Sequence, residues 1–129
     1  MEQGQIKIGV AWINKTGYAN IYIGKGSPLG NQFAFSQMTQ SERDVVCDKF
    51  YGLFTANMKH KSSEMYEEVK RLFEMANSGI DINLQCYCKD KDLRCHGETI
   101  KEYLDIMLTK YRTNPQMVNT DFPSRIVIL

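Results

Sequence analysis

Apolar and polar residues alternate near the N-terminus, and this pattern predicts two strands. In segment 5–13 an apolar side chain recurs at every second position, beginning with Ile6 and Ile8, which is typical of a half-buried strand. The Asn-Lys-Thr-Gly sequence at 14–17 has the composition of a turn, and the strand pattern resumes at 18–23. We therefore predict an N-terminal β-hairpin.

Further along the chain the apolar spacing changes to three or four residues, which predicts three main helices. The first follows Gln40 with Ser41 as its expected N-cap, the second is capped by Ser62 or Ser63 and ends before Gly79, and the third begins at Cys95–Gly97. Their apolar stripes are Val46, Phe50, Leu53 and Phe54; Met65, Val69, Leu72, Phe73 and Ala76; and Ile100, Tyr103, Leu104, Met107, Leu108 and Tyr111.

The clearest strand pattern lies between the second and third helices, at residues 80–88. The tail 112–129 is irregular, and its last residues, 125–129, are short enough for an edge strand. Strands and helices are therefore intermixed along the chain, which predicts an α/β sandwich with helices packed on a mixed sheet. We assign residues 1–129 to a single domain of this class.

Composition and charge narrow the possible functions. The chain has 129 residues, a hydrophobic fraction of 43% and a formal net charge of +1, so we expect one folded domain and no tight nonspecific binding to duplex DNA. No apolar run approaches the roughly 20 residues of a membrane helix. The N-terminus lacks an apolar signal segment. We expect no membrane partner and a reducing cytoplasm, where the four cysteines are free, metal-bound or reactive.

Three of the four cysteines and one of two histidines fall within the sequence CYCKDKDLRCHG, residues 86–97. Cys86, Cys88, Cys95 and His96 have the number and type of ligands that zinc requires. However, the Cys-x-Cys spacing is tight, and the adjacent Cys-His pair has to converge on one ion. We therefore favour no metal, and retain zinc on these four residues as the alternative. Cys86 also shares a strand face with apolar residues, where a buried cysteine packs as a small hydrophobe.

The expected start of the third helix has a different chemistry. Backbone N–H groups at a helix N-terminus attract anions and favour a thiolate. Arg94 and Gly97 would add a cation and close backbone approach, and Cys95 and His96 are candidate catalytic residues. We expect replacement of His96 to weaken ligand binding at little cost to stability.

A second candidate segment is the glycine-containing loop that follows the second strand. Its glycines do not match a Rossmann or P-loop spacing, but they allow backbone N–H groups to face a phosphate. The loop also holds a cation, a hydroxyl and an amide, and an aromatic residue precedes it. The candidate ligand-binding residues are Tyr22, Gly24, Lys25, Gly26, Ser27, Gly30, Asn31, Arg94 and Gly97.

The two segments together, YIGKGSPLGNQF at 22–33 and CYCKDKDLRCHG, resemble a phage and bacterial family catalogued as a domain of unknown function. The family pattern is Tyr-Ile-Gly-Arg-Gly, Gly-Asn-Pro-Phe, Cys-x-Cys and Cys-His-Gly, and the resemblance covers about residues 5–108. Two departures stand out: Lys25 replaces an arginine and loses its bidentate fork, and Gln32 replaces a rigid proline. The resemblance implies that these residues form a site, in a host cytoplasm if the protein is viral, but it supplies no activity.

Both segments follow a strand and lead toward a helix, so both belong at the carboxyl edge of the sheet, where α/β proteins bind ligands. Our first interpretation is a pocket for a phosphorylated small ligand, a nucleotide or nucleotide derivative, that a phage protein would sequester or process. The alternatives are a nucleotide-processing hydrolase or glycosidase that uses Cys95 and His96, and a zinc-stapled, non-enzymatic interaction module. The sequence leaves the protein partner open.

Overall fold

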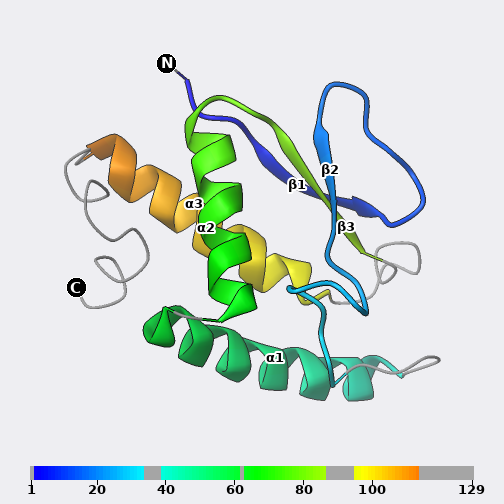
Figure 1. Cartoon of the computed structure of the whole chain (residues 1–129). Coiled ribbons are helices and arrows are strands. Elements are labelled where there is room, and N and C mark those ends of the chain that lie inside the picture. The colour runs from blue at the N-terminus through cyan, green and yellow to red at the C-terminus, as the bar shows by residue number, and fades with distance from the viewer. Residues whose placement is uncertain (1, 34–38, 62, 87–94, 114–129) are drawn as a thin grey trace.

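The computed structural model describes residues 2–33, 39–61, 63–86 and 95–113 (Figure 1). Three strands and three helices occur in these ranges. In chain order they are β1 (Ile6–Val10), β2 (Ala19–Tyr22), α1 (Gln40–His60), α2 (Glu64–Asn77), β3 (Ile82–Cys86) and α3 (Gly97–Thr113).

The first helix begins with a capping box. The hydroxyl of Thr39 accepts a hydrogen bond from the Glu42 backbone N–H, and the Glu42 carboxylate accepts one from the Thr39 N–H. The N-cap is therefore Thr39 rather than the expected Ser41, because the reciprocal bonds require Glu42 at the third helical position. These bonds also lower the pKa of Glu42.

Local capping and backbone conformation explain where α1 ends and where α2 begins and ends. The helix α1 continues through His60 and ends at Lys61, which has a φ of 65°. The prediction for α2 is confirmed: Ser63 caps its N-terminus and Gly79 follows its end with a φ of 103°. In the described ranges, no helix has both the length and the apolar character needed to cross a membrane.

The three strands form one sheet in the order β1-β3-β2. The predicted α/β class, the N-terminal pair of strands and the three main helices are confirmed. The arrangement within the sheet differs from the prediction, because β3 lies between β1 and β2 and pairs with both of them in parallel. The described strands therefore form a parallel sheet rather than a mixed one with a directly paired hairpin.

The connection between β1 and β2 explains this difference. Two tight turns close with hydrogen bonds from Ile13 N to Val10 O, 3.1 Å, and from Tyr18 N to Lys15 O, 3.2 Å. The segment 11–18 loops back to the starting end of the sheet before β2 begins (Figure 1). Alternating apolar residues indicate a strand but not its direction or its neighbour, and the turn composition at 14–17 fits this longer return as well as a hairpin.

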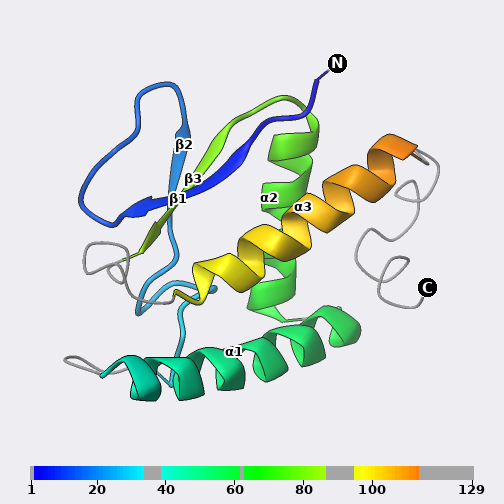
Figure 2. The same cartoon turned by 180° about the vertical axis from the view of Figure 1, so that it is seen from behind.

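The central strand has one apolar face and one amide face, and all five of its residues are buried. Ile82, Leu84 and Cys86 belong to the main apolar core, which they share with residues of all three helices. Within this core α3 packs against α2 and β1, and α1 packs against α2 (Figure 2). The core therefore lies between the sheet and the helices.

The opposite face of β3 carries Asn83 and Gln85, whose burial is balanced by hydrogen bonds. The Asn83 amide donates to Asn20 Oδ1 at 2.8 Å. The Gln85 amide donates to Ile13 O at 3.0 Å and to Asn14 Oδ1 at 2.9 Å. Because each of these amide groups has a partner, the segment that joins β1 to β2 can cover this face without leaving buried donors unpaired.

Two predictions on the C-terminal region have different outcomes. The helix α3 extends to Thr113 and so includes the first residues of the segment expected to be irregular. The expected edge strand at 125–129 lies outside the described residues. Its pairing stays a prediction.

Replacing Gly4 should test the close backbone packing beside β1. A Cβ at this position would lie 1.9 Å from Ile80 O, so we expect Gly4→Ala to lower the free energy of unfolding by about 1–3 kcal/mol. Gly52→Ala, in α1 with open space around its Cβ, should instead raise it by about 0.5–1 kcal/mol. Urea unfolding of both variants measures the difference, and equal effects would contradict this account of the packing.

Candidate metal centre

The end of β3 and the start of α3 lie close together in space. Cys86 is the last residue of β3, and Cys95 and His96 immediately precede α3. The Sγ atoms of Cys86 and Cys95 are 2.7 Å apart. One ligand atom from each of Cys86, Cys95 and His96 lies within 4.8 Å of the others, so these three residues could hold a metal ion.

The whole cluster is buried. Cys86 is 2% exposed, Cys95 is 3% exposed and His96 is 3% exposed. The ring of His96 packs against the ring of Phe50 in an edge-on arrangement, with centroids 4.9 Å apart. Cys86 and Cys95 also belong to the apolar core. Burial accords with the expected packing role of Cys86, and it extends that role to Cys95 and His96.

The imidazole of His96 is oriented by the backbone at the end of β2. Its Nε2 lies 2.7 Å from Ile23 O. A carbonyl oxygen only accepts hydrogen bonds, so Nε2 carries a proton, and in the neutral imidazole Nδ1 then keeps its lone pair. That Nδ1 is 4.0 Å from Cys95 Sγ. The hydrogen bond to Ile23 therefore leaves the nitrogen that faces the sulfurs available as a metal ligand.

Cys95 acts as a capping residue at the start of α3. Its sulfur accepts a hydrogen bond from Gly97 N at 3.3 Å, and its own backbone N–H donates to Glu98 Oε2 at 3.2 Å. The N–H groups of Glu98 and Thr99 close turns onto Cys95 O and His96 O. These backbone donors, which the sequence offered for an anion, are engaged inside the protein.

Gly97 lies where the start of α3 approaches the end of β2. A Cβ on Gly97 would lie 2.8 Å from Ile23 Cδ1 and 3.3 Å from Cys95 Sγ. A larger residue would push the start of α3 away from the end of β2. The glycine that the sequence suggested for contact with a ligand therefore serves packing beside the cluster.

The glycine-containing loop is folded by its own hydrogen bonds. Ser27 donates from its backbone N–H and from its hydroxyl to Gly24 O, at 3.1 and 2.7 Å, and Gly30 N donates to Ser27 O at 3.0 Å. Lys25 and Gly26 are exposed at the first turn, and Gly26 has a φ of 92° that favours glycine. The exposed part of the loop is thus its tip.

Of the other predicted ligand residues, Asn31 faces the interior and Tyr22 lies at the surface. Asn31 is buried, donates to Val46 O at 3.1 Å and accepts from Phe33 N at 3.0 Å, so its amide joins the loop to α1. Tyr22 is 38% exposed, and a Cβ on Gly24 would lie 2.3 Å from its hydroxyl. Tyr22 therefore stands at the surface beside the start of the loop.

The helix corner contacts the residue that precedes the glycine-containing loop, because His96 Nε2 bonds to Ile23 O. A common pocket of the two segments stays a prediction. The predicted site residues Cys88 and Arg94 lie outside the described residues. Cys47 is a buried residue of α1, and it is not part of the group that could hold a metal. The described cluster therefore contains three of the four residues considered for zinc.

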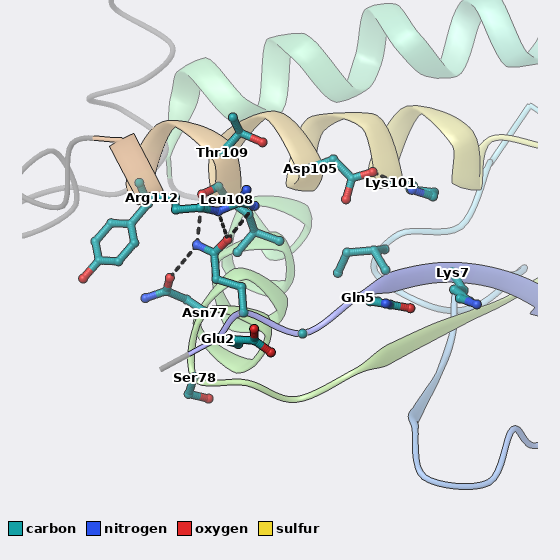
Figure 3. Close-up of a pocket in the computed structure, with 14 residues that line it drawn as sticks. Glu2, Gln5, Lys7, Asn77, Ser78, Lys101, Asp105, Leu108, Thr109 and Arg112 are labelled. Atoms are coloured by element: carbon teal, nitrogen blue, oxygen red, sulfur yellow. Dashed lines mark hydrogen bonds and ion pairs between the residues drawn. The ribbon is translucent and has the colours of Figure 1, made fainter.

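A broad hollow lies at the other end of the sheet, and no sequence pattern predicts it. It lies between the N-terminal segment and α3 (Figure 3). Gln3 crosses it by donating to Asn77 Oδ1 at 3.0 Å and Leu108 O at 2.9 Å, while the guanidinium of Arg112 donates to Gln3 Oε1. Because residues distant in sequence build it, no local motif marks it, and these polar groups satisfy one another.

Comparison with known proteins identifies the family. A family model described as "Domain of unknown function (DUF4326)" matches residues 11–106. The matched region contains both the glycine-containing loop and the cluster, and it agrees with the resemblance drawn from the two sequence blocks. No curated protein and no solved structure matches the chain.

The burial of His96 generates a stability prediction that differs from the one made on sequence. His96→Ala should lower the free energy of unfolding by about 2–4 kcal/mol, since it leaves a cavity beside Phe50 and removes the partner of Ile23 O. The matched control is His60→Ala, an exposed residue in the last turn of α1, which should change stability by less than about 0.5 kcal/mol. Urea unfolding with a chelator present excludes any effect of metal. A similar small change in both variants would argue against the buried hydrogen bond.

Proposed function

We propose that this chain, which belongs to the DUF4326 family, binds one zinc ion through Cys86, Cys95 and His96. The observation that carries this proposal is the convergence of two buried sulfurs and an imidazole nitrogen from separate elements. The proposal replaces the sequence-based preference for no metal. Although Cys95 and His96 are adjacent in sequence, one ligand atom of each lies within 4.8 Å of the Cys86 sulfur.

The donor set fits zinc in type. Thiolates and a neutral imidazole suit zinc, whereas magnesium and calcium prefer oxygen ligands. Two cysteines and a histidine leave one further position in a tetrahedral site. The four ligands considered from the sequence include Cys88, which lies outside the described residues. A Cys88→Ser variant tests whether it contributes.

Hydrogen bonds around the ligands support the same proposal. Histidines that bind metals usually donate their second ring nitrogen to a carbonyl or carboxylate, and His96 does so to Ile23 O. The sulfur of Cys95 accepts from Gly97 N, which stabilises negative charge on a thiolate. The protein therefore orients two of the ligands through its own backbone.

An ion at this position would act as a staple. It would join the end of β3 to the start of α3, and through the hydrogen bond of His96 it would also hold the residue that precedes the glycine-containing loop. The burial of Cys95 and His96 keeps both from a substrate of nucleotide size. The geometry thus favours a zinc-stapled module over catalysis by these two residues. A reducing cytoplasm, where thiols remain available to zinc, is part of the proposal.

A second proposed function concerns the surface outside the cluster. Tyr22 is the last residue of β2 and is 38% exposed, and Trp12 follows β1 and is 58% exposed. Both lie at the carboxyl edge of the sheet, where α/β proteins bind ligands. The exposed Lys25 and Gly26 lie at the tip of the loop on the same edge. We propose that a phosphorylated ligand of nucleotide type binds here, with the phosphate at Lys25 and the base against an aromatic ring.

Metal analysis tests the staple. Protein purified from cells without chelator should contain close to one zinc per chain, and Cys86→Ser or Cys95→Ser should reduce this to less than about a tenth, because each removes a ligand. Cys47→Ser is the matched control, since it also changes a buried cysteine but lies outside the cluster. Elemental analysis combined with native mass spectrometry gives the metal and its stoichiometry.

Cobalt substitution covers the case in which a cysteine variant fails to fold. Tetrahedral cobalt(II) bound through sulfur absorbs strongly in the visible and near-ultraviolet, so the wild-type spectrum alone reports the ligand type. A variant Cys88→Ser that keeps one equivalent of metal would assign the fourth position to a ligand other than Cys88. Absence of bound zinc and of a cobalt–thiolate spectrum in folded wild-type protein would overturn the staple.

Calorimetric titration tests the ligand surface with adenosine monophosphate, adenosine and inorganic phosphate as probes. Lys25→Ala should weaken binding of the monophosphate by about tenfold, because a charge-assisted contact to the phosphate is lost. Lys59→Ala, an exposed lysine near the end of α1, is the control for general charge. Failure of all three probes to bind, or an equal effect of both lysines, would remove this second function.

A further inference from the structure

We infer that Cys86 and Cys95 are a redox pair, which forms a reversible disulfide and releases the metal when oxidised. This inference rests on the proposed zinc site for its metal-release step. Its geometric basis is the separation of 2.7 Å between the two sulfurs, which come from residues nine positions apart in the sequence. In the described ranges neither cysteine is part of a disulfide.

The two sulfurs need little movement to bond. A disulfide has an S–S length of about 2.05 Å, so each sulfur would move by a few tenths of an ångström from its present position. The bond would join the last residue of β3 to the residue that caps α3. Closing it therefore requires rotation of side chains rather than rearrangement of either element.

The contacts distinguish the roles that the two cysteines play in the oxidation. Cys95 Sγ accepts the Gly97 N–H at the start of α3, a position that favours a thiolate nucleophile. With a peroxide as the oxidant, the thiolate of Cys95 attacks one oxygen, the O–O bond breaks, and a sulfenic acid forms with release of hydroxide. The sulfur of Cys86 then attacks Cys95 Sγ and displaces a second hydroxide, and two protons taken from solvent turn both hydroxides into water.

The oxidised state loses the metal because the ion loses two of its three described ligands. Two electrons pass from the sulfurs to the peroxide, so zinc leaves unchanged as a divalent ion. The disulfide continues to join β3 to α3, and His96 can keep its hydrogen bond to Ile23 O. The same edge of the sheet is thus closed by a metal in the reduced state and by a covalent bond in the oxidised state.

Oxidation of the full-length, zinc-loaded protein with limiting hydrogen peroxide tests the inference. A chromogenic zinc indicator follows release, and non-reducing peptide mapping by mass spectrometry identifies the linked cysteines. We expect one zinc released for each Cys86–Cys95 disulfide, an unchanged far-ultraviolet circular dichroism spectrum, and recovery of zinc binding after dithiothreitol and zinc are added. Cys47→Ser should behave as wild type, since Cys47 lies outside the cluster.

Two further arms separate this inference from the proposed zinc function. In chelator-treated wild type and Cys88→Ser, peroxide should form the same Cys86–Cys95 bond, so the pair is tested even if the protein never holds zinc. If peroxide forms the Cys86–Cys95 disulfide but the reduced protein never binds zinc, the zinc function and the release step are wrong. The redox pair then stands. A stable sulfinic acid at Cys95, a bond that involves Cys88 instead, or zinc release only on unfolding would overturn the redox pair.

Discussion

The hydrogen bond between His96 Nε2 and Ile23 O is the contact on which the carboxyl edge of this protein depends. It joins the start of α3 to the end of β2, across a sheet whose central strand supplies Cys86. Because the carbonyl fixes the proton on Nε2, it also directs Nδ1 toward the sulfurs. One bond therefore determines how a helix, a loop and a candidate metal ligand are placed.

The parallel direction of the strands explains why residues distant in sequence gather at this edge. A central parallel strand is buried on both faces, and here one face is apolar while the other carries amides that pair with β2 and with the segment between β1 and β2. Since all three strands point the same way, the residues that follow them gather at one end. Trp12, Lys25 and Cys86 reach the same edge for this reason, although they are far apart in sequence.

Helices were easier to predict from this sequence than strand pairing or burial. Apolar spacing and a serine cap located α2 because both signals are local. The N-cap of α1 was misplaced because a capping box depends on a reciprocal bond between Thr39 and Glu42, which a propensity ranking does not include. Pairing of β1 with β3 depends on the path of the chain through space, and a period of two residues carries no information about that path.

The candidate site shows the same limit in its chemistry. The types of ligand at 86–97 are evident in the sequence, but their geometry depends on the path of the backbone, which spacing along the chain does not give. In the folded protein Cys95 turns its sulfur back onto the helix start while His96 reaches Ile23, so neighbouring residues meet Cys86 from different directions. That turn also engages the N–H groups assigned to an anion. The corner therefore brings sulfur and nitrogen atoms together inside the protein, whereas Lys25 and Tyr22 lie exposed at its surface.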